Sequence, residues 1–272
     1  MFTFIFVISL ILSIFGFASI FQKQALLPDL YAHTAFPGIV FAYVLFGIDN
    51  FFMLTVGALF TVYLFRFFYN SIVQSSRFSS DNALASTISG GFALGILGVN
   101  VLQNLGIKTK FDFSGFLFGN ISAISQDELF NLTIFALFLV CLGFFLRNVL
   151  SVFIFDKEFL FLRSKSFYHI FKFLFELVLI LLVVICLKVS GVVLTTGLFL
   201  IPVSIAMFNV TSFKSILLRL VFLCGFVSFV GLNISQYYSG VSTGPVLVLL
   251  YFFVFIAQRI SYYLSNLKMW NR

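Results

Sequence analysis

Nine apolar runs of about 20 residues dominate this sequence, separated by short charged or turn-forming stretches. A helix needs roughly 20 residues to cross the hydrocarbon of a bilayer, which is about 30 Å thick. Only 9% of the 272 residues are charged, whereas soluble domains carry roughly 25%. The pattern excludes a water-soluble enzyme and predicts an all-α, multi-pass transmembrane helical bundle, a single domain over residues 1–272. The runs cover approximately 2–21, 29–47, 51–70, 83–105, 129–149, 168–187, 191–209, 213–234 and 244–264.

Proline and glycine mark three of these runs. Pro37 and Gly38 in the second run, and Pro202 in the seventh, predict helix breaks, because proline removes a backbone donor and crowds the preceding turn. We expect these breaks to lie near a functional path. The fourth run has four glycines, which allow close packing between helices: Gly90, Gly91, Gly95 and Gly98.

The basic residues predict the orientation of the spans. If nine spans alternate in direction, one set of connections holds every lysine and arginine except Lys108, Lys110 and Lys188. Cytoplasmic connections carry such an excess, so the N-terminus is predicted outside and the C-terminus in the cytoplasm. A first run lying on the membrane surface would give eight spans and leave the rest unchanged. The residues placed inside are Lys23, Arg66, Arg77, Arg147, Lys157, Arg163, Lys165, Lys172, Lys214, Arg219, Arg259, Lys268 and Arg272.

Two connections are long enough to contain structure of their own. The outer one, residues 106–128, is rich in glycine and apolar residues and predicts a short helix at the membrane interface. The inner one, residues 150–167, interleaves apolar side chains with Asp156, Lys157, Glu158, Arg163 and Lys165. Such a cytoplasmic amphipathic helix can dock in a groove on a partner. The alternative is a helix that lies on the lipid headgroups.

Asp29 and His33 are the ionisable residues that stand out inside a span. Four residues apart on a helix, they share one face, with about 6 Å between the side-chain roots. Ionisable side chains in a membrane are costly and typical of functional sites. A carboxylate and an imidazole suit zinc or manganese, and a site with only two ligands can release a transported ion. A structural hydrogen bond that locks helices together and a proton relay are alternative interpretations.

Other polar residues give weaker signals. Glu176 follows Lys172 by four residues, and we expect the two side chains to pair along one helix face. His169 lies at the cytoplasmic edge of the same span, where a hydrated histidine is expected. The remaining candidates could line a path or hydrogen-bond neighbouring helices: Asn100, Gln103, Asn104, Thr195, Thr196, Asn209 and Asn233.

The motifs of common hydrolytic enzymes are absent. The sequence has no G-x-x-x-x-G-K-[ST], no H-E-x-x-H and no G-x-S-x-G, so it cannot hydrolyse ATP through a P-loop. We interpret the formal charge of +7 as the result of basic residues that orient the membrane spans, and not as a sign of nucleic-acid binding. Function classes that remain are a permease working with a separate ATPase, an ion-coupled secondary transporter that needs none, and an intramembrane enzyme.

Five motifs in chain order are similar to those of one transporter family. The first is Asp29-Leu-Tyr-Ala-His33-Thr-Ala-Phe-Pro37-Gly38, similar to Asp-Ala-Leu-Ser-His-Ala-x-x-Pro-Gly. The others are Asp81-Asn-Ala-Leu, Phe116-Leu-Phe-Gly-Asn-Ile121, Phe155-Asp-Lys-Glu-Phe159, and Gly191-Val-Val-Leu followed by Leu200-Ile-Pro-Val-Ser-Ile-Ala206. Over roughly residues 25–260, the sequence resembles the membrane permease subunit of ABC-type zinc and manganese uptake systems.

The resemblance implies a permease of the cytoplasmic (inner) membrane that moves a divalent metal ion, with zinc favoured and manganese or iron as alternatives. It implies no enzymatic activity and no permanently bound cofactor. Its partners would be an ABC ATPase subunit, an extracytoplasmic metal-binding protein and a second copy of the chain. Asp29 and His33 would line the ion path, and the segment with Phe155, Asp156 and Glu158 would be the coupling helix that touches the ATPase.

Overall fold

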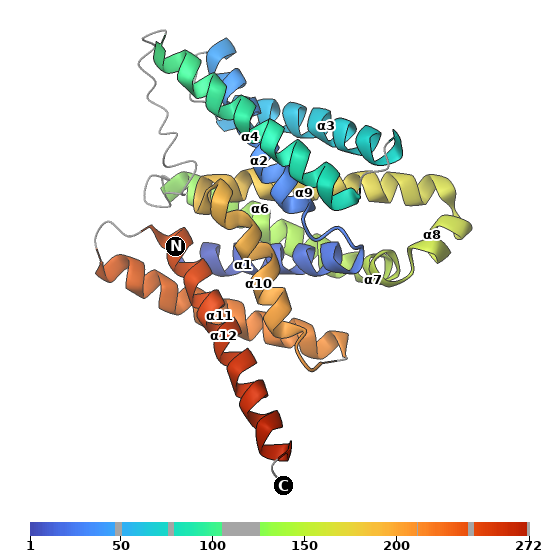
Figure 1. The fold of residues 1–272 in the computed structure, drawn as a ribbon, viewed down its shortest axis with the longest axis vertical. Coiled ribbons are helices and arrows are strands. Elements are labelled where there is room, and N and C mark those ends of the chain that lie inside the picture. Colours follow the sequence, from blue (N-terminus) through green and yellow to red (C-terminus); the bar gives the residue numbers. More distant parts are fainter. Residues whose placement is uncertain (47–50, 76–78, 105–125, 211, 239–241, 271–272) are drawn as a thin grey trace.

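The computed structural model describes residues 1–46, 51–75, 79–104, 126–210, 212–238 and 242–270, which form helices and no strands. This confirms the all-α prediction. Figure 1 shows α2, α3 and α4 gathered at one end of the molecule, α11 and α12 at the opposite end, and α1, α9 and α10 between them. The helices are α1 (Phe2–Phe21), α2 (Leu27–Phe46), α3 (Phe51–Ser75), α4 (Ser80–Asn104), α6 (Gln126–Phe145), α7 (Arg147–Phe155), α8 (Lys157–Arg163), α9 (Lys165–Ser190), α10 (Val192–Ala206), α11 (Phe213–Tyr237) and α12 (Thr243–Trp270).

Each apolar run is helical, although the helices are not nine straight spans. Among the described residues, seven helices are long and apolar enough to cross a membrane: α1, α2, α3, α4, α9, α11 and α12. The run at 129–149 is divided between α6 and α7, which meet at an angle of 74°. The run at 191–209 forms α10, whose 15 residues rise about 22 Å. The interfacial helix predicted within 106–128 falls mainly on residues 105–125, outside the described part of the chain.

α1 lies within the bundle and not along its surface. It packs against α6, α10 and α11, and Ile5 and Leu12 are fully buried. Gly16 approaches α10 so closely that a Cβ there would overlap the carbonyl oxygen of Phe199. A helix that lay on the headgroups would keep one face in water, so this packing does not fit the surface alternative for the first run.

α2 and α3 cross at a pair of glycines. Gly38 of α2 faces Gly57 of α3, and a Cβ on either residue would overlap the carbonyl oxygen of the other. In lipid, helices associate largely through van der Waals packing, so small residues that let two backbones approach are favoured at the crossing. Gly38 is thus a packing position.

α4 covers another side of α2 with the glycines of the fourth run. A Cβ at Gly91 would lie 2.7 Å from the Thr34 methyl group, and one at Gly98 would lie 2.8 Å from Val40. Gly95 likewise leaves room for the Phe36 ring. The predicted packing role is confirmed for these three glycines. Gly90 has no atom within 4 Å of its Cβ position and takes no part in the contact.

Pro37 and Pro202 do not interrupt their helices, so the helix breaks predicted at Pro37-Gly38 and at Pro202 are wrong. α2 continues past Pro37 to Phe46, and α10 continues past Pro202 to Ala206. Membrane helices tolerate proline where neighbouring groups satisfy the disturbed backbone. Here Thr61 of α3 donates a hydrogen bond of 2.8 Å to the Thr34 carbonyl, next to the His33 carbonyl, whose helical partner would be the amide that Pro37 lacks.

Residues 150–167, the segment predicted to couple to an ATPase and called the coupling segment below, contribute to three helices. The segment holds the end of α7, all of α8 and the start of α9. The Asp156 side chain accepts a hydrogen bond of 3.0 Å from the Phe159 amide, and Ser164 accepts one of 3.4 Å from the Phe167 amide. Such caps begin new helices. The single amphipathic helix predicted for this segment is therefore wrong.

We expect Gly38→Ala to destabilise the protein, because the added Cβ overlaps backbone atoms of α3 that no rotamer change can move. Overpacking typically costs about 1–3 kcal/mol, which corresponds to a loss of roughly 5 °C in a protein of this size. Heating in detergent, followed by measurement of the monodisperse fraction, would report this loss. Gly90→Ala is the matched control, since its Cβ meets open space and alanine favours a helix by about 1 kcal/mol. Equal stability of the two variants would contradict the close crossing.

Candidate functional site

Asp29 and His33 are the two partly exposed positions on an otherwise buried stretch of α2. From residue 27 to residue 40 every other side chain is buried, because α2 packs against α3, α4, α9 and α10. The Asp29 side chain keeps 27% of its exposure and the His33 side chain 19%. Their four-residue spacing places them on one helix face. The structure thus brings the predicted pair together and leaves it accessible.

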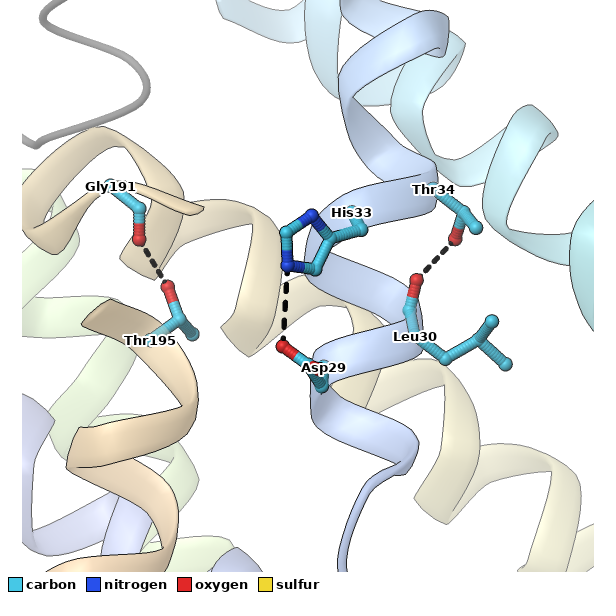
Figure 2. Close-up of polar contacts among 6 residues, drawn as sticks. All are labelled: Asp29, Leu30, His33, Thr34, Gly191 and Thr195. Atoms are coloured by element: carbon cyan, nitrogen blue, oxygen red, sulfur yellow. Dashed lines mark hydrogen bonds and ion pairs between the residues drawn. The ribbon is translucent and has the colours of Figure 1, made fainter. Parts of the chain in front are cut away.

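The imidazole and the carboxylate touch without forming a tight hydrogen bond. Figure 2 shows His33 Nε2 directed toward Asp29 Oδ1, 3.4 Å away, which is longer than the usual range of about 2.7–3.2 Å. His33 Nδ1 is buried without a hydrogen-bond partner among the described residues. The ring packs edge-on against Phe92 of α4, with 5.2 Å between the centroids. Packing therefore orients the ring while its nitrogens remain weakly engaged.

The contact between Asp29 and His33 lies within one helix. Both residues belong to α2, so their interaction cannot lock two helices together, as the structural alternative requires. A pair that adds only a long contact along one exposed face contributes little to stability. Because the two side chains share one helix face, both can contact a single cation.

No third His, Cys, Asp or Glu joins this pair among the residues that the structure describes. α10 packs against α2, and Figure 2 draws Thr195 of α10 across from the pair. The Thr195 hydroxyl donates to the Gly191 carbonyl at 2.6 Å, within its own helix. The site formed by this pair therefore offers one carboxylate and one imidazole.

α8 presents both charged and apolar side chains outward. Glu158 is exposed in its first turn, while Phe159 is 50% and Leu162 82% exposed. Leu160 is buried and anchors the helix. Phe155, just before α8, packs edge-on against Phe213 at 5.8 Å. This short helix is thus attached to the bundle on one side and open to contact on the other.

An ion pair joins α3 to α9, with Arg66 buried and Glu176 half-buried. Arg66 Nη2 donates to Glu176 Oε1 at 2.9 Å, so the predicted pairing of Glu176 with Lys172 is wrong. Arg66 lies in the interior of α3. The count of basic residues had assigned it to a cytoplasmic connection. The sequence offered one signal, an acidic and a basic residue each inside an apolar run. It could not show that two residues 110 positions apart meet.

The family of this chain is shown by its similarity to known proteins. The sequence model described as the ABC 3 transport family matches residues 2–261. The chain belongs to the ABC 3 transport family. This confirms the family that the five motifs predicted.

Relatives of this ABC 3 protein carry metal-transport names. It is 26% identical over 244 residues to a "Probable iron transport system membrane protein" of Haemophilus influenzae, with 90% of this chain and 86% of the relative covered. It is 28% identical over 264 residues to the "Manganese import system permease protein ScaB" of Streptococcus gordonii, with 93% and 89% covered. Its fold is similar to a chain of PsaBC from Streptococcus pneumoniae in complex with Fab, with a TM-score of 0.77, 24% identity, and 94% and 88% of the two chains covered.

The motifs of this ABC 3 protein lie at distinct points of the fold. The first occupies α2, Asp81 lies in the first turn of α4, and the motif from Leu200 to Ala206 ends α10. The motif from Phe155 to Phe159 straddles the junction of α7 and α8. The motif at 116–121 lies outside the described residues. The motif positions thus mark the Asp29/His33 face and the coupling segment.

We expect Asp156→Ala to loosen the start of α8 in this ABC 3 protein, because the side chain that accepts from the Phe159 amide is removed. Loss of such a cap costs about 1 kcal/mol, or roughly a fivefold rise in local opening. Hydrogen exchange of the α8 amides would report it. Asp156→Ser keeps a capping oxygen and should exchange nearly as slowly as the unmodified protein. Equal exchange in all three proteins would contradict the cap.

Proposed function

We propose that this chain is the membrane permease subunit of an ATP-binding cassette importer that carries a divalent transition-metal ion into the cytoplasm. Membership in the ABC 3 transport family supports the transporter class. The iron and manganese transport names of the relatives support a metal ion as substrate. The observation that carries the proposal is the Asp29/His33 pair, which stays accessible on an otherwise buried stretch of α2.

The ion binds to this pair transiently during translocation. The carboxylate of Asp29 offsets part of the cost of a doubly charged ion inside the membrane. The imidazole of His33 favours a borderline transition metal over magnesium. Water or polar groups of other spans complete the coordination, and so few strong ligands allow release. Zinc, manganese and iron(II) all suit these ligands.

The bias of basic residues supports an orientation with the N-terminus outside and the C-terminus inside. Arg66, Lys172, Arg219 and Arg259 lie inside helices, whereas Lys23, Lys157, Arg163, Lys165 and Lys214 lie between helices or at helix ends, so the bias does not depend on Arg66. The coupling segment then lies in the cytoplasm, where its exposed Glu158 and Phe159 can meet an ATPase subunit. An extracytoplasmic metal-binding protein delivers the ion to a homodimer of this chain in the inner membrane. The chain itself hydrolyses no ATP.

An ion-coupled secondary transporter could use the same Asp29/His33 pair without an ATPase. Membership in the ABC 3 transport family does not favour this alternative. Reconstitution of the purified chain alone, with a proton gradient and no ATPase subunit, separates the two. Metal movement under those conditions would replace the importer by a secondary transporter.

We expect Asp29→Asn and His33→Ala each to reduce metal uptake at least tenfold in membranes with matched protein levels. Asn preserves the size of the Asp29 side chain and removes its charge, so fold and ion passage are separated. Asp29→Glu keeps the charge and should retain part of the uptake. Uptake of zinc, manganese and iron(II) measured in parallel would identify the substrate.

His169→Ala is the matched control for His33→Ala, because the chain has two histidines and His169 is exposed near the start of α9. Its uptake should equal that of the unmodified protein. Near-normal uptake by both Asp29→Asn and His33→Ala would reject the metal site.

We expect Glu158→Lys to uncouple ATP hydrolysis from metal transport, because Glu158 is exposed and caps no amide. Asp156→Ser removes the neighbouring charge and keeps the cap of α8. The double variant with Glu158→Lys and Asp156→Ser therefore tests the effect of charge while α8 is preserved. ATPase activity and metal uptake are measured together in the reconstituted complex, and metal binding should persist. Unchanged coupling would mean that these acidic side chains only stabilise the start of α8 through the helix dipole.

A further inference from the structure

The Arg66/Glu176 ion pair lies in the interiors of α3 and α9, apart from the residues proposed to bind metal. The two side chains are 8% and 20% exposed, with 2.9 Å between nitrogen and oxygen. Charges in hydrocarbon are costly and are retained where they serve a function or are paired. Neither residue lies in the five motifs. The pair therefore calls for a function of its own.

Several buried polar atoms at and around this pair lack hydrogen-bond partners among the described residues. Nε and Nη1 of Arg66 are buried without hydrogen-bond partners among the described residues, as are the hydroxyls of Tyr31 and Tyr63. The guanidinium also lies over the Tyr69 ring, 5.2 Å from its centroid. With two donors unpaired, Arg66 depends on Glu176 for most of its compensation. Separation of α3 from α9 would leave both charges uncompensated, so the pair resists this movement more than apolar side chains would.

α9 connects the ion pair to the coupling segment. Glu176 lies eleven residues after Lys165, the first residue of α9, which is about 16 Å along a continuous helix. Aromatic rings pack the junction, with Phe161 of α8 at 5.6 Å from Tyr168 and Phe153 of α7 at 5.2 Å from Phe175. A displacement of α8 therefore reaches Glu176 through packed rings and one unbroken helix.

α3 connects the ion pair to the helix that carries Asp29 and His33. Besides the glycine crossing, Thr61 of α3 donates to the Thr34 carbonyl of α2 at 2.8 Å. Tyr31 of α2 is fully buried, on a helix that packs against both α3 and α9. Two residues along a helix correspond to about 200°, so Tyr31 faces away from Asp29 and His33. α2 thus has the metal pair on one face and the charged pair behind the other.

We propose that Arg66 and Glu176 are positioning residues that transmit movement of the coupling segment, through α9 and α3, to the Asp29/His33 pair. This inference rests on the proposed function. The buried charges make α3 follow α9, because sliding past each other would break their compensation. Apolar replacements would fill the same space but allow α9 to move without α3. The role is mechanical, since the two side chains are engaged with each other and are not among the residues proposed to bind the ion.

Paired replacements separate this role from stability. Arg66→Met with Glu176→Leu removes both charges, a change that buried ion pairs often tolerate in folding. Arg66→Glu with Glu176→Arg exchanges them and keeps an ion pair. Both are reconstituted with the ATPase subunit, and metal ions moved per ATP hydrolysed are measured alongside metal affinity. Lys172→Met is the control for charge loss on α9, one turn before Glu176.

We expect the apolar double variant to fold and bind metal, and its complex with the ATPase subunit to hydrolyse ATP but to move about tenfold less metal per ATP, within the usual range of coupling between sites. The charge-exchanged variant should recover most of the ratio, and Lys172→Met should match the unmodified complex. Should the exchanged pair fail to fold, Arg66→Lys supplies a second charged pair for the same comparison. An apolar double variant with a normal ratio, or charged pairs that do no better than the apolar one, would overturn the proposal.

The unmodified complex distinguishes this failure from failure of the proposed function. If the unmodified complex moves no metal in response to ATP, the importer itself is rejected. If it does, and the ratio is insensitive to the Arg66/Glu176 pair, only the mechanical link is rejected.

Discussion

The absence of water in the bilayer is the constraint on which this structure depends. Each backbone N–H and C=O must find its partner within the segment that crosses the hydrocarbon, so the apolar runs become helices. The same solvent removes the hydrophobic force between helices, because lipid tails are as apolar as leucine. Close backbone approach must replace it. The meeting of Gly38 with Gly57 and the fit of Phe36 against Gly95 are the result.

This packing also determines where chemistry is possible. α2 is enclosed by α3, α4, α9 and α10, which leaves Asp29 and His33 as the accessible positions in its first half. An isolated carboxylate would be costly at such a place, and an isolated imidazole would offer a weak ligand. Together on one face they form a polar site with few ligands on an otherwise apolar helix. Such a site suits an ion that must bind and then be released.

The coupling segment and the ion pair give the fold a mechanical continuity. Asp156 and Ser164 begin α8 and α9 with side-chain caps, so the segment is divided among separate helices and is not one long helix. α9 then runs from the segment to Glu176 without interruption. Since Arg66 belongs to α3, which crosses α2 at the glycines, the segment and the Asp29/His33 face are joined by packed helices throughout.

The sequence by itself determined the features that depend on local chemistry. Apolar run length fixed which residues become helices, and the four-residue spacing of Asp29 and His33 fixed their common face, because both follow from the geometry of a single helix. The motifs fixed the family. The interruption of α2 at Pro37 was wrongly predicted, since proline's effect depends on what a neighbouring helix supplies.

Only the tertiary structure decided the contacts between distant segments. It paired Glu176 with Arg66 in place of Lys172, because burial against α3 outweighed a weak pairing along one helix. It placed α1 within the bundle, divided the coupling segment, and assigned Gly91 but not Gly90 to packing. These outcomes depend on which helices meet and at what distance, and neither hydropathy nor spacing along one chain contains that information.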